Sequence, residues 1–138
     1  MVRAYVFRTT PRVRFSSERI QKILSHVSRK EKINKAEITF VFIGDRRMVA
    51  LNSRFLHHHR TTDILTFPMG NDPLVAEVYI NVQEARRQSK VHGVSLENEL
   101  LRLVVHGVLH AFGYDDRTPK ERKAMVTRQE RYVEELSS

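Results

Sequence analysis

The pattern of hydrophobic and polar residues predicts a strand, a helix and a second strand in the first third of the chain. Residues 2–8 (VRAYVFR) alternate well enough for a first strand. A helix follows, with Ser16 or Ser17 as its N-cap. Its apolar positions recur at helical spacing: Ile20, Ile23, Leu24 and Val27. Residues 37–43 (EITFVFI) are β-branched and aromatic, which predicts a buried strand that ends at Gly44.

The middle of the chain predicts a short helix and two further strands. The apolar face of that helix comprises Met48, Leu51 and Phe55. A polar turn, residues 57–62 (HHHRTT), leads into a short strand at residues 64–67 that Pro68 should stop. Residues 69–73 (MGNDP) should form a loop before the next strand, residues 75–80 (VAEVYI).

Two helices are predicted next from capping residues and apolar spacing. Asn81 with Glu84 is typical of a capping box, which would start a helix over residues 82–91. His92 and Gly93 should end that helix. A second helix is expected after the N-cap Ser95, with these apolar positions: Leu96, Leu100, Leu103, Val104 and Leu109.

A final helix completes the predicted architecture. Thr118 and Glu121 form a capping box with Pro119 at the first helical position, and this helix should run towards Leu136. Strands and helices are mixed without strict βαβ alternation. The chain therefore predicts an α+β fold, with a small mixed sheet of about four strands and helices packed on it. At 138 residues, it should form a single domain, residues 1–138.

Composition narrows the partners and the chemistry. The chain contains 24 Lys and Arg against 16 Asp and Glu, a formal net charge of +8, which favours polyanions such as nucleic acids. There are no cysteines, so disulfides and thiolate metal sites are excluded. No apolar run approaches the roughly 18 residues of a membrane span, and the N-terminus lacks the apolar core of a signal peptide. We therefore expect a cytoplasmic protein without a membrane partner.

The helix after Ser95 carries a candidate metal site in the segment VVHGVLHAFGYDD. His106 and His110 are four residues apart, so their side chains lie one above the other on the helix. Gly113 permits a sharp turn that can return Asp116 to the same point. Two imidazoles and one carboxylate leave an open position for water, as in catalytic zinc sites. The helix is thus a candidate zincin-like metal-binding helix.

Other interpretations of the histidines remain open at this point. A pair of histidines four apart also occurs in helices that bind no metal. His57, His58 and His59 form a second candidate cluster, but neighbouring residues point in different directions, which favours a solvated loop. Position 107 holds glycine where metalloproteases of the His-Glu-x-x-His kind place their general base, and this argues against ordinary peptide hydrolysis.

Two segments together match the signature of a known family. HGVLHAFGYDD resembles the pattern His-Gly-x-Leu-His-Leu-x-Gly-Tyr-Asp-His at His106, Gly107, Leu109, His110, Gly113, Tyr114 and Asp115. LNSRFLHHHRTTDILTFP is similar to a Leu-Asn segment followed by Thr-Asp-Val-Leu-Ser-Phe-Pro, at Leu51, Asn52 and residues 62–68. Both patterns are those of the YbeY family, bacterial ribosomal RNA maturation factors, and the resemblance covers nearly the whole chain.

The resemblance implies a metal-dependent endoribonuclease that cleaves single-stranded RNA. Its cellular work would be ribosomal RNA processing, notably at the 3′ end of the small-subunit 16S RNA, and ribosome quality control. The implied cofactor is one Zn²⁺ per chain, held by His106, His110 and position 116, which would act in catalysis through a metal-bound water. The implied partners are ribosomal RNA and the ribosome or its proteins. Oligomeric state is not indicated.

The chain departs from the family pattern at two positions that bear on its chemistry, and more mildly where the family's Gly-Asp-Ile reads Ala76, Glu77 and Val78. Asp116 stands where the usual third histidine is expected, and Asp115 is an alternative third ligand. A carboxylate there should make the bound water less acidic than a third histidine would, and it approaches the pattern of non-haem iron sites. An arginine of the family aligns with Leu56, for which Arg54 or Arg60 could substitute.

The sequence leaves more than one mechanism and function open. Metal-bound hydroxide, or a metal-polarised phosphate, could drive RNA cleavage, and the general base is undetermined. Basic side chains should hold the strand through its phosphates: Arg46, Arg47, Arg54, Arg60, Arg86, Arg87 and Lys90. One alternative is a metal-bearing ribosome-assembly factor that binds RNA without cutting it. Another is a metallohydrolase or non-haem iron enzyme that acts on small molecules.

Overall fold

A computed structural model describes residues 1–10, 14–56 and 62–137 of the chain. Its elements follow one another in this order: β1 (Val2–Arg8), α1 (Ser17–Glu31), β2 (Ala36–Ile43), α2 (Asp45–Leu56), β3 (Ile64–Asn71), β4 (Leu74–Asn81), α3 (Val82–His92), α4 (Leu96–Ala111) and α5 (Pro119–Leu136). Each predicted strand and helix is present, and the α+β class with a four-stranded mixed sheet is confirmed.

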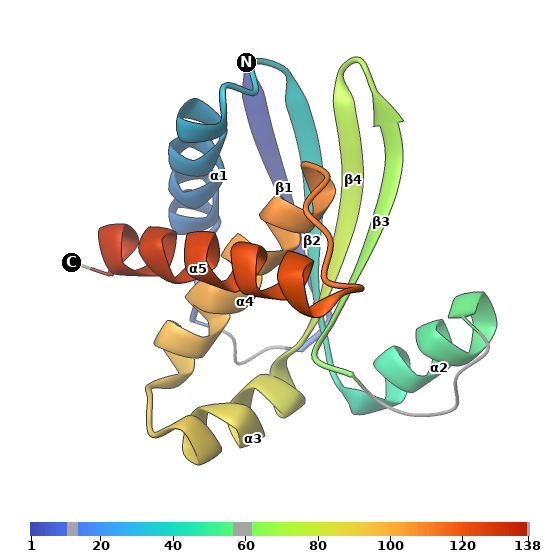
Figure 1. Ribbon diagram of the computed structural model, residues 1–138. Helices are drawn as coiled ribbons and strands as arrows, with labels where there is room; N and C mark the ends of the chain where they lie inside the picture. The colour runs from blue at the N-terminus through green and yellow to red at the C-terminus, as the bar shows by residue number, and fades with distance from the viewer. Residues whose placement is uncertain (11–13, 57–61, 138) are drawn as a thin grey trace.

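The sheet has the strand order β1-β2-β4-β3 (Figure 1). β1, β2 and β4 are parallel to one another, whereas β3 pairs with β4 in the antiparallel direction. A parallel neighbour needs a crossover connection, and α1 supplies it between β1 and β2. α1 and α4 pack on the sheet, and α5 packs on α4. α2 projects away from these helices, beyond the end of the sheet (Figure 1).

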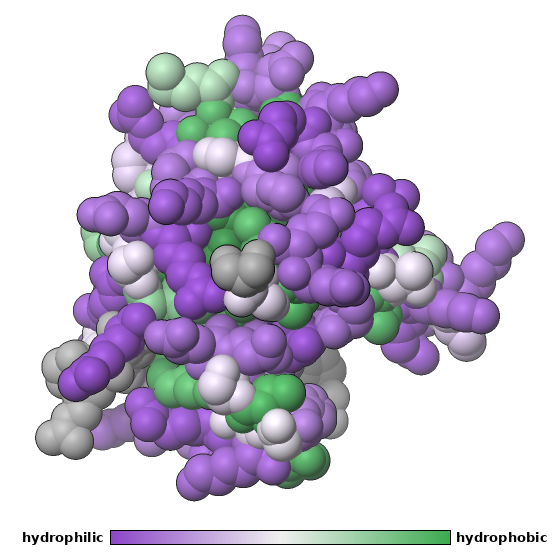
Figure 2. Space-filling view, turned by 90° about the vertical axis from the view of Figure 1, so that its left-hand side faces the viewer, coloured by the Kyte–Doolittle hydropathy of each residue, from purple (hydrophilic) through white to green (hydrophobic). Residues whose placement is uncertain are grey.

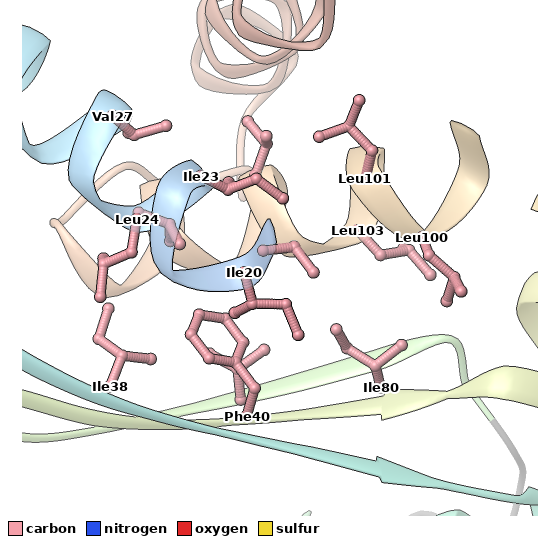
Figure 3. Close-up of a cluster of buried hydrophobic side chains, with 14 of the residues drawn as sticks. Ile20, Ile23, Leu24, Val27, Ile38, Phe40, Ile80, Leu100, Leu101 and Leu103 are labelled. Atoms are coloured by element: carbon pink, nitrogen blue, oxygen red, sulfur yellow. The ribbon is translucent and has the colours of Figure 1, made fainter. Parts of the chain in front are cut away.

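The hydrophobic core lies between the sheet and the helices α1 and α4. Alternate residues of the central strands, such as Ile38, Phe40 and Ile80, are fully buried on the helix side of the sheet. Figure 3 shows them facing apolar side chains of α1 and α4: Ile20, Ile23, Leu24, Leu100 and Leu103. Burying each such side chain stabilises the fold by about 1.5–3 kcal/mol, so α4 is anchored along its length.

One side of the molecule is mainly polar. Figure 2 shows that the face over α1 and the end of α5 is mainly hydrophilic, with apolar residues in small, separate areas. Within the described part of the chain, every helix is too short or too polar to span a lipid bilayer.

Side-chain caps fix the helix starts largely where the sequence predicts them. Ser16, rather than Ser17, caps α1 by accepting a hydrogen bond from the backbone of Arg19. Thr118 and Glu121 form the complete capping box that starts α5, with Pro119 in its first turn. Asn81 caps α3, but the predicted capping box is only half formed. Its backbone N–H donates to the carbonyl oxygen of Asp63 at 2.9 Å, which ties the start of α3 to the chain before β3.

The prediction for β3 was wrong in its extent. The strand does not stop at Pro68 but continues to Asn71, with a register shift between Pro68 and Gly70. β3 is an edge strand, and a proline without an N–H is tolerated there because one side of the strand forms no ladder. The expected loop 69–73 is therefore reduced to a tight connection at Asp72 and Pro73, joined by a cis peptide bond.

Candidate metal centre

α4 presents both predicted histidines on one side. The rings of His106 and His110 are nearly parallel, with an interplanar angle of 8° and centroids 6.4 Å apart. The opposite side of α4 is buried in the core, for example at Val104 and Val108, so packing fixes which way the histidines face. Both imidazoles are half-buried, as expected for side chains that line a cleft.

The turn after α4 returns the chain towards His110. Gly113 adopts a φ of +107°, a conformation that other residues rarely take. The backbone N–H groups of Gly113 and Tyr114 donate to the carbonyl oxygens of His110 and Leu109, each at 3.1 Å. This geometry gathers one possible ligand atom each from His110, Asp115 and Asp116 within 4.8 Å of one another. The cluster could hold a metal ion.

Asp115 and Asp116 differ in their surroundings. The Asp115 carboxylate accepts hydrogen bonds from the backbone of Asp116 at 2.9 Å and lies 3.0 Å from Nε of Arg117. Asp116 lines the cleft together with both histidines. Asp116 is thus the aspartate of this pair that lines the cleft, whereas the Asp115 carboxylate has partners within the turn.

His106 lies outside the 4.8 Å cluster but has a partner that fixes its chemistry. Its Nδ1 is 2.8 Å from Oε1 of Gln129, a buried residue of α5. The amide nitrogen of Gln129 donates to Glu130 at 3.1 Å, so the amide oxygen faces the imidazole. An amide oxygen only accepts, so Nδ1 carries the proton and Nε2 keeps a lone pair for a ligand bond.

His110 supplies an independent test of whether the site suits a metal. Its Nδ1 is buried and has no hydrogen-bond partner among the residues that the structure describes. A buried polar atom without a partner is costly, and a metal bond or a water would remove that cost. Two imidazoles with a carboxylate form a donor set that zinc and related transition metals bind, so the residues present fit such an ion.

The candidate ligands open into a cleft of about 640 Å³. It is lined by Thr62, Asp63, Ile64, Leu65, Thr66, Gln88, His92, Glu99, Arg102, Leu103, His106, His110, Asp116 and Gln129. Burial raises the pKa of Asp63, and the nearby His106 partly offsets this effect. Residues 62–66 belong to the second segment that the sequence singled out, so β3 and α4 bring the two motifs together.

The predicted RNA-binding residues lie elsewhere on the surface. Arg46, Arg47, Arg54, Arg86, Arg87 and Lys90 are exposed on α2 and α3, and none of these six lines the cleft. Arg87 is held by Asp45 and Glu84, at 2.6 and 2.7 Å. Arg60 and the histidines at 57–59 fall outside the described residues, as does the side chain of Leu56.

The sequence reasoning missed one basic residue of the cleft, Arg102. It lies one helical turn before His106 on α4, a spacing that could have pointed to it. Its guanidinium donates to both carboxylate oxygens of Glu130, at 2.8 and 3.0 Å, and to Asn98 at 2.7 Å. The bonds to Glu130 outweigh partial burial and raise the pKa of Arg102 above its ordinary value, which keeps its charge at the cleft wall.

Gly107 explains why the peptidase glutamate is absent. A Cβ atom at this position would lie 2.7 Å from Cγ1 of Val78 and 3.2 Å from Cδ1 of Ile64. α4 therefore approaches β3 and β4 too closely for any side chain at 107. The packing that places the histidines at the cleft excludes a general base from this position.

Gln129→Leu should weaken metal binding without removing a ligand. The leucine keeps the buried volume but no longer accepts the His106 proton, so the imidazole loses its fixed tautomer. Loss of such a partner typically lowers metal affinity about 10–100-fold. Zn²⁺ affinity can be measured by competition with a chromogenic chelator. Gln129→Glu, which keeps an acceptor oxygen, is the matched control, and equal affinities of Gln129→Leu and wild type would contradict the assigned role.

Comparisons with known proteins agree in both sequence and structure. The family model described as Endoribonuclease YbeY matches residues 8–137. An Endoribonuclease YbeY from Chloroherpeton thalassium is 33% identical over 86% of this chain and 85% of its own length. One from Chlorobium phaeobacteroides is 31% identical over 96% of both chains. A solution structure of a Thermotoga maritima protein covers 97% of this chain and 89% of its own, with a TM-score of 0.71 and 26% identity.

Proposed function

This chain belongs to the endoribonuclease YbeY family, and we propose that it cleaves single-stranded RNA at the cleft beside α4. The observation that carries the proposal is that ligand atoms of His110, Asp115 and Asp116 lie within 4.8 Å of one another, with His110 and Asp116 lining that cleft. A basic protein with a net charge of +8 also attracts a polyanionic substrate. Support for the activity comes from the relatives, which are named endoribonucleases, and from the donor set of the site.

The proposed cellular substrate is ribosomal RNA. Within it we place the cut at the 3′ end of the small-subunit 16S RNA, with a further part in ribosome quality control. The ribosome or its proteins would then be partners. This proposal is supported by membership of the family, which the chain resembles most clearly in the segments around His106 and Asp63.

The proposed cofactor is one Zn²⁺ per chain, held by His106, His110 and Asp116. When bound, the ion lowers the pKa of a coordinated water and neutralises charge on a phosphate oxygen. Zinc suits two imidazoles and one carboxylate, with room for a further ligand. His106 stands one helical turn from His110, and its contact with Gln129 through Nδ1 leaves Nε2 as the nitrogen that would join the ligand set.

The protein's own groups bind and orient the RNA. We expect the exposed cations of α2 and α3 to contact RNA phosphates outside the cleft, chiefly Arg46, Arg47, Arg86 and Lys90. Arg87 contributes less, because Asp45 and Glu84 already neutralise its charge. Contacts of this kind should make RNA affinity fall steeply with added salt.

Asp116→Ala should weaken Zn²⁺ binding and RNA cleavage, whereas Asp115→Ala should leave both largely intact. The reason is that Asp116 lines the cleft, while the Asp115 carboxylate is paired with Arg117 at 3.0 Å. Loss of Asp116 should lower the cleavage rate by at least about tenfold, a larger effect than a substitution at an unrelated surface residue would have. Asp116→His, which replaces the carboxylate with a neutral imidazole ligand, should retain zinc. The opposite order of the two alanine variants would make Asp115 the third ligand.

The single test of the function is cleavage of a labelled single-stranded RNA by the purified protein. Cleavage should stop on chelation, return with Zn²⁺, and spare a matched duplex. The alternatives, a non-cleaving assembly factor and a small-molecule enzyme, gain no support from relatives that carry the name endoribonuclease.

A further inference from the structure

One carboxylate joins three elements of the fold beside the metal centre. Glu31, the last residue of α1, accepts hydrogen bonds from the hydroxyl of Tyr114 at 2.7 Å and from Arg128 at 2.9 Å. The hydroxyl of Tyr132 also donates to it. Tyr114 lies in the turn after α4, and the other two donors lie on α5. The guanidinium of Arg128 stacks over the Tyr114 ring, 5.3 Å from its centroid.

The bonds to Glu31 have different consequences for the two tyrosines. Tyr132 belongs to α5, which is held in register by its own helix and by packing on α4. Tyr114 stands in a short non-helical turn, between Gly113 and the two aspartates. Among the described residues, the contact of Asp116 with α5 is one long hydrogen bond of 3.4 Å, which Arg122 donates to the carbonyl oxygen of Asp116. Tyr114 is thus the main side-chain anchor of this turn among the described contacts.

We propose that Tyr114, anchored on Glu31, is a positioning residue that holds the turn so that Asp116 reaches His110. The inference rests on the proposed metal centre, in which Asp116 is the third ligand, and concerns the contact that holds Asp116 in place. Tyr114 touches no reacting group, and its effect passes through the backbone of the turn to Asp116. A ligand on an ordered turn pays less conformational entropy when the metal binds than one on a free turn.

The chemistry of Glu31 makes it a durable anchor. Its side chain is 10% exposed, and two oxygens serve three donors, Oε1 for Tyr114 and Oε2 for Arg128 and Tyr132. Burial alone would raise the pKa of Glu31, but the bonds from both tyrosines and Arg128 outweigh it and hold that pKa below the ordinary value. The carboxylate therefore remains charged at neutral pH, and charged acceptors form stronger hydrogen bonds.

Tyr114→Phe and Tyr132→Phe form a matched pair of tests. Each removes one hydroxyl from the same carboxylate and keeps the aromatic ring, but only Tyr114 is part of the turn. Zn²⁺ affinity of the full-length protein should be measured by chelator competition without RNA. It should fall about tenfold in Tyr114→Phe, which is the lower end of the loss seen when a residue that supports a metal ligand is removed. It should be unchanged in Tyr132→Phe. Thermal unfolding of the metal-free proteins should show comparable losses of stability for both.

The outcomes separate this inference from the proposed function. Equal zinc affinity of Tyr114→Phe and wild type would overturn the positioning role, while chelator-sensitive RNA cleavage would leave the function standing. A loss of zinc affinity as large in Tyr132→Phe would also overturn it, since the effect would then come from general stability. If wild type binds no zinc, the inference and the proposed metal centre both fail. In the double variant Asp116→Ala with Tyr114→Phe, the tyrosine change should have no further effect on zinc affinity.

Discussion

Replacing His110 with alanine should reduce the rate of cleavage of single-stranded RNA by at least about a hundredfold. The loss should exceed that caused by removing a residue that only hydrogen-bonds to a metal ligand. His110 is the one histidine that the structure, over its described residues, places within 4.8 Å of both aspartates. Its removal leaves two carboxylates and a single, more distant imidazole, a set that holds zinc poorly at neutral pH. Cleavage and zinc content should therefore fall together, and added Zn²⁺ should not restore the variant.

His92→Ala is a suitable control for this experiment. His92 lines the same cleft but lies outside the ligand cluster and contacts Glu99 instead, at 3.2 Å. The control should keep its zinc and most of its activity. If His110→Ala retains both wild-type cleavage and chelator sensitivity, the metal-nuclease assignment of this cleft is wrong. If it loses zinc but still matures ribosomal RNA like wild type, the non-cleaving assembly factor becomes the better interpretation.

The second large effect is expected at Gly107, where even alanine should destabilise the protein. The added Cβ would lie 2.7 Å from Cγ1 of Val78, a fully buried and β-branched side chain that cannot easily turn away. Overpacking of this kind costs about 1–3 kcal/mol, against a gain of up to about 1 kcal/mol in helix propensity. The free energy of unfolding in urea should therefore fall, by up to about 2 kcal/mol.

A double-mutant cycle with Val78→Ala can show whether the cost is steric. Removing the Val78 methyl groups makes room for the new Cβ, so the two changes together should destabilise less than the sum of each alone, by at least about 0.5 kcal/mol. Gly93→Ala is the backbone control. The φ of Gly93, +67°, is unfavourable for alanine, while a Cβ added there would meet no atom of the described residues within 4 Å, its chain neighbours aside. Additive effects of Gly107→Ala and Val78→Ala would contradict the close packing of α4 on the sheet.

Local signals in the sequence predicted the helices and strands, whereas the points at which the structure differs from the prediction depend on non-local contacts. Capping residues and apolar spacing predicted the helices, because both act within a few residues of the chain. The capping box at Asn81 was only half right because its backbone N–H bonds to Asp63, which no local pattern reveals. The end of β3 was misplaced because Pro68 stops a central strand but is tolerated on an edge strand, and strand order is a property of the whole sheet.

The candidate site likewise contains residues that the local sequence predicts and residues whose place depends on how the helices pack. His106, His110, Gly113 and Asp116 lie within eleven residues, so helix geometry and one glycine were enough to bring three of them into the cleft. Gln129 comes from another helix, and its contact with His106 depends on how α5 packs on α4. The predicted basic residues were selected by charge alone, and none of the six that the structure describes lines the cleft, whereas Arg102 does.

The irregular course of β3 also bears on how the protein behaves at high concentration. The outermost strands of a sheet can pair with strands of other molecules, which leads to aggregation. On the β3 side, Pro68 removes a donor and the shift before Gly70 breaks the repeat that an incoming strand would have to match. On the β1 side, the exposed residues Arg3 and Arg8 bring like charges together when two copies approach. Both open edges of the sheet thus carry features that discourage self-association.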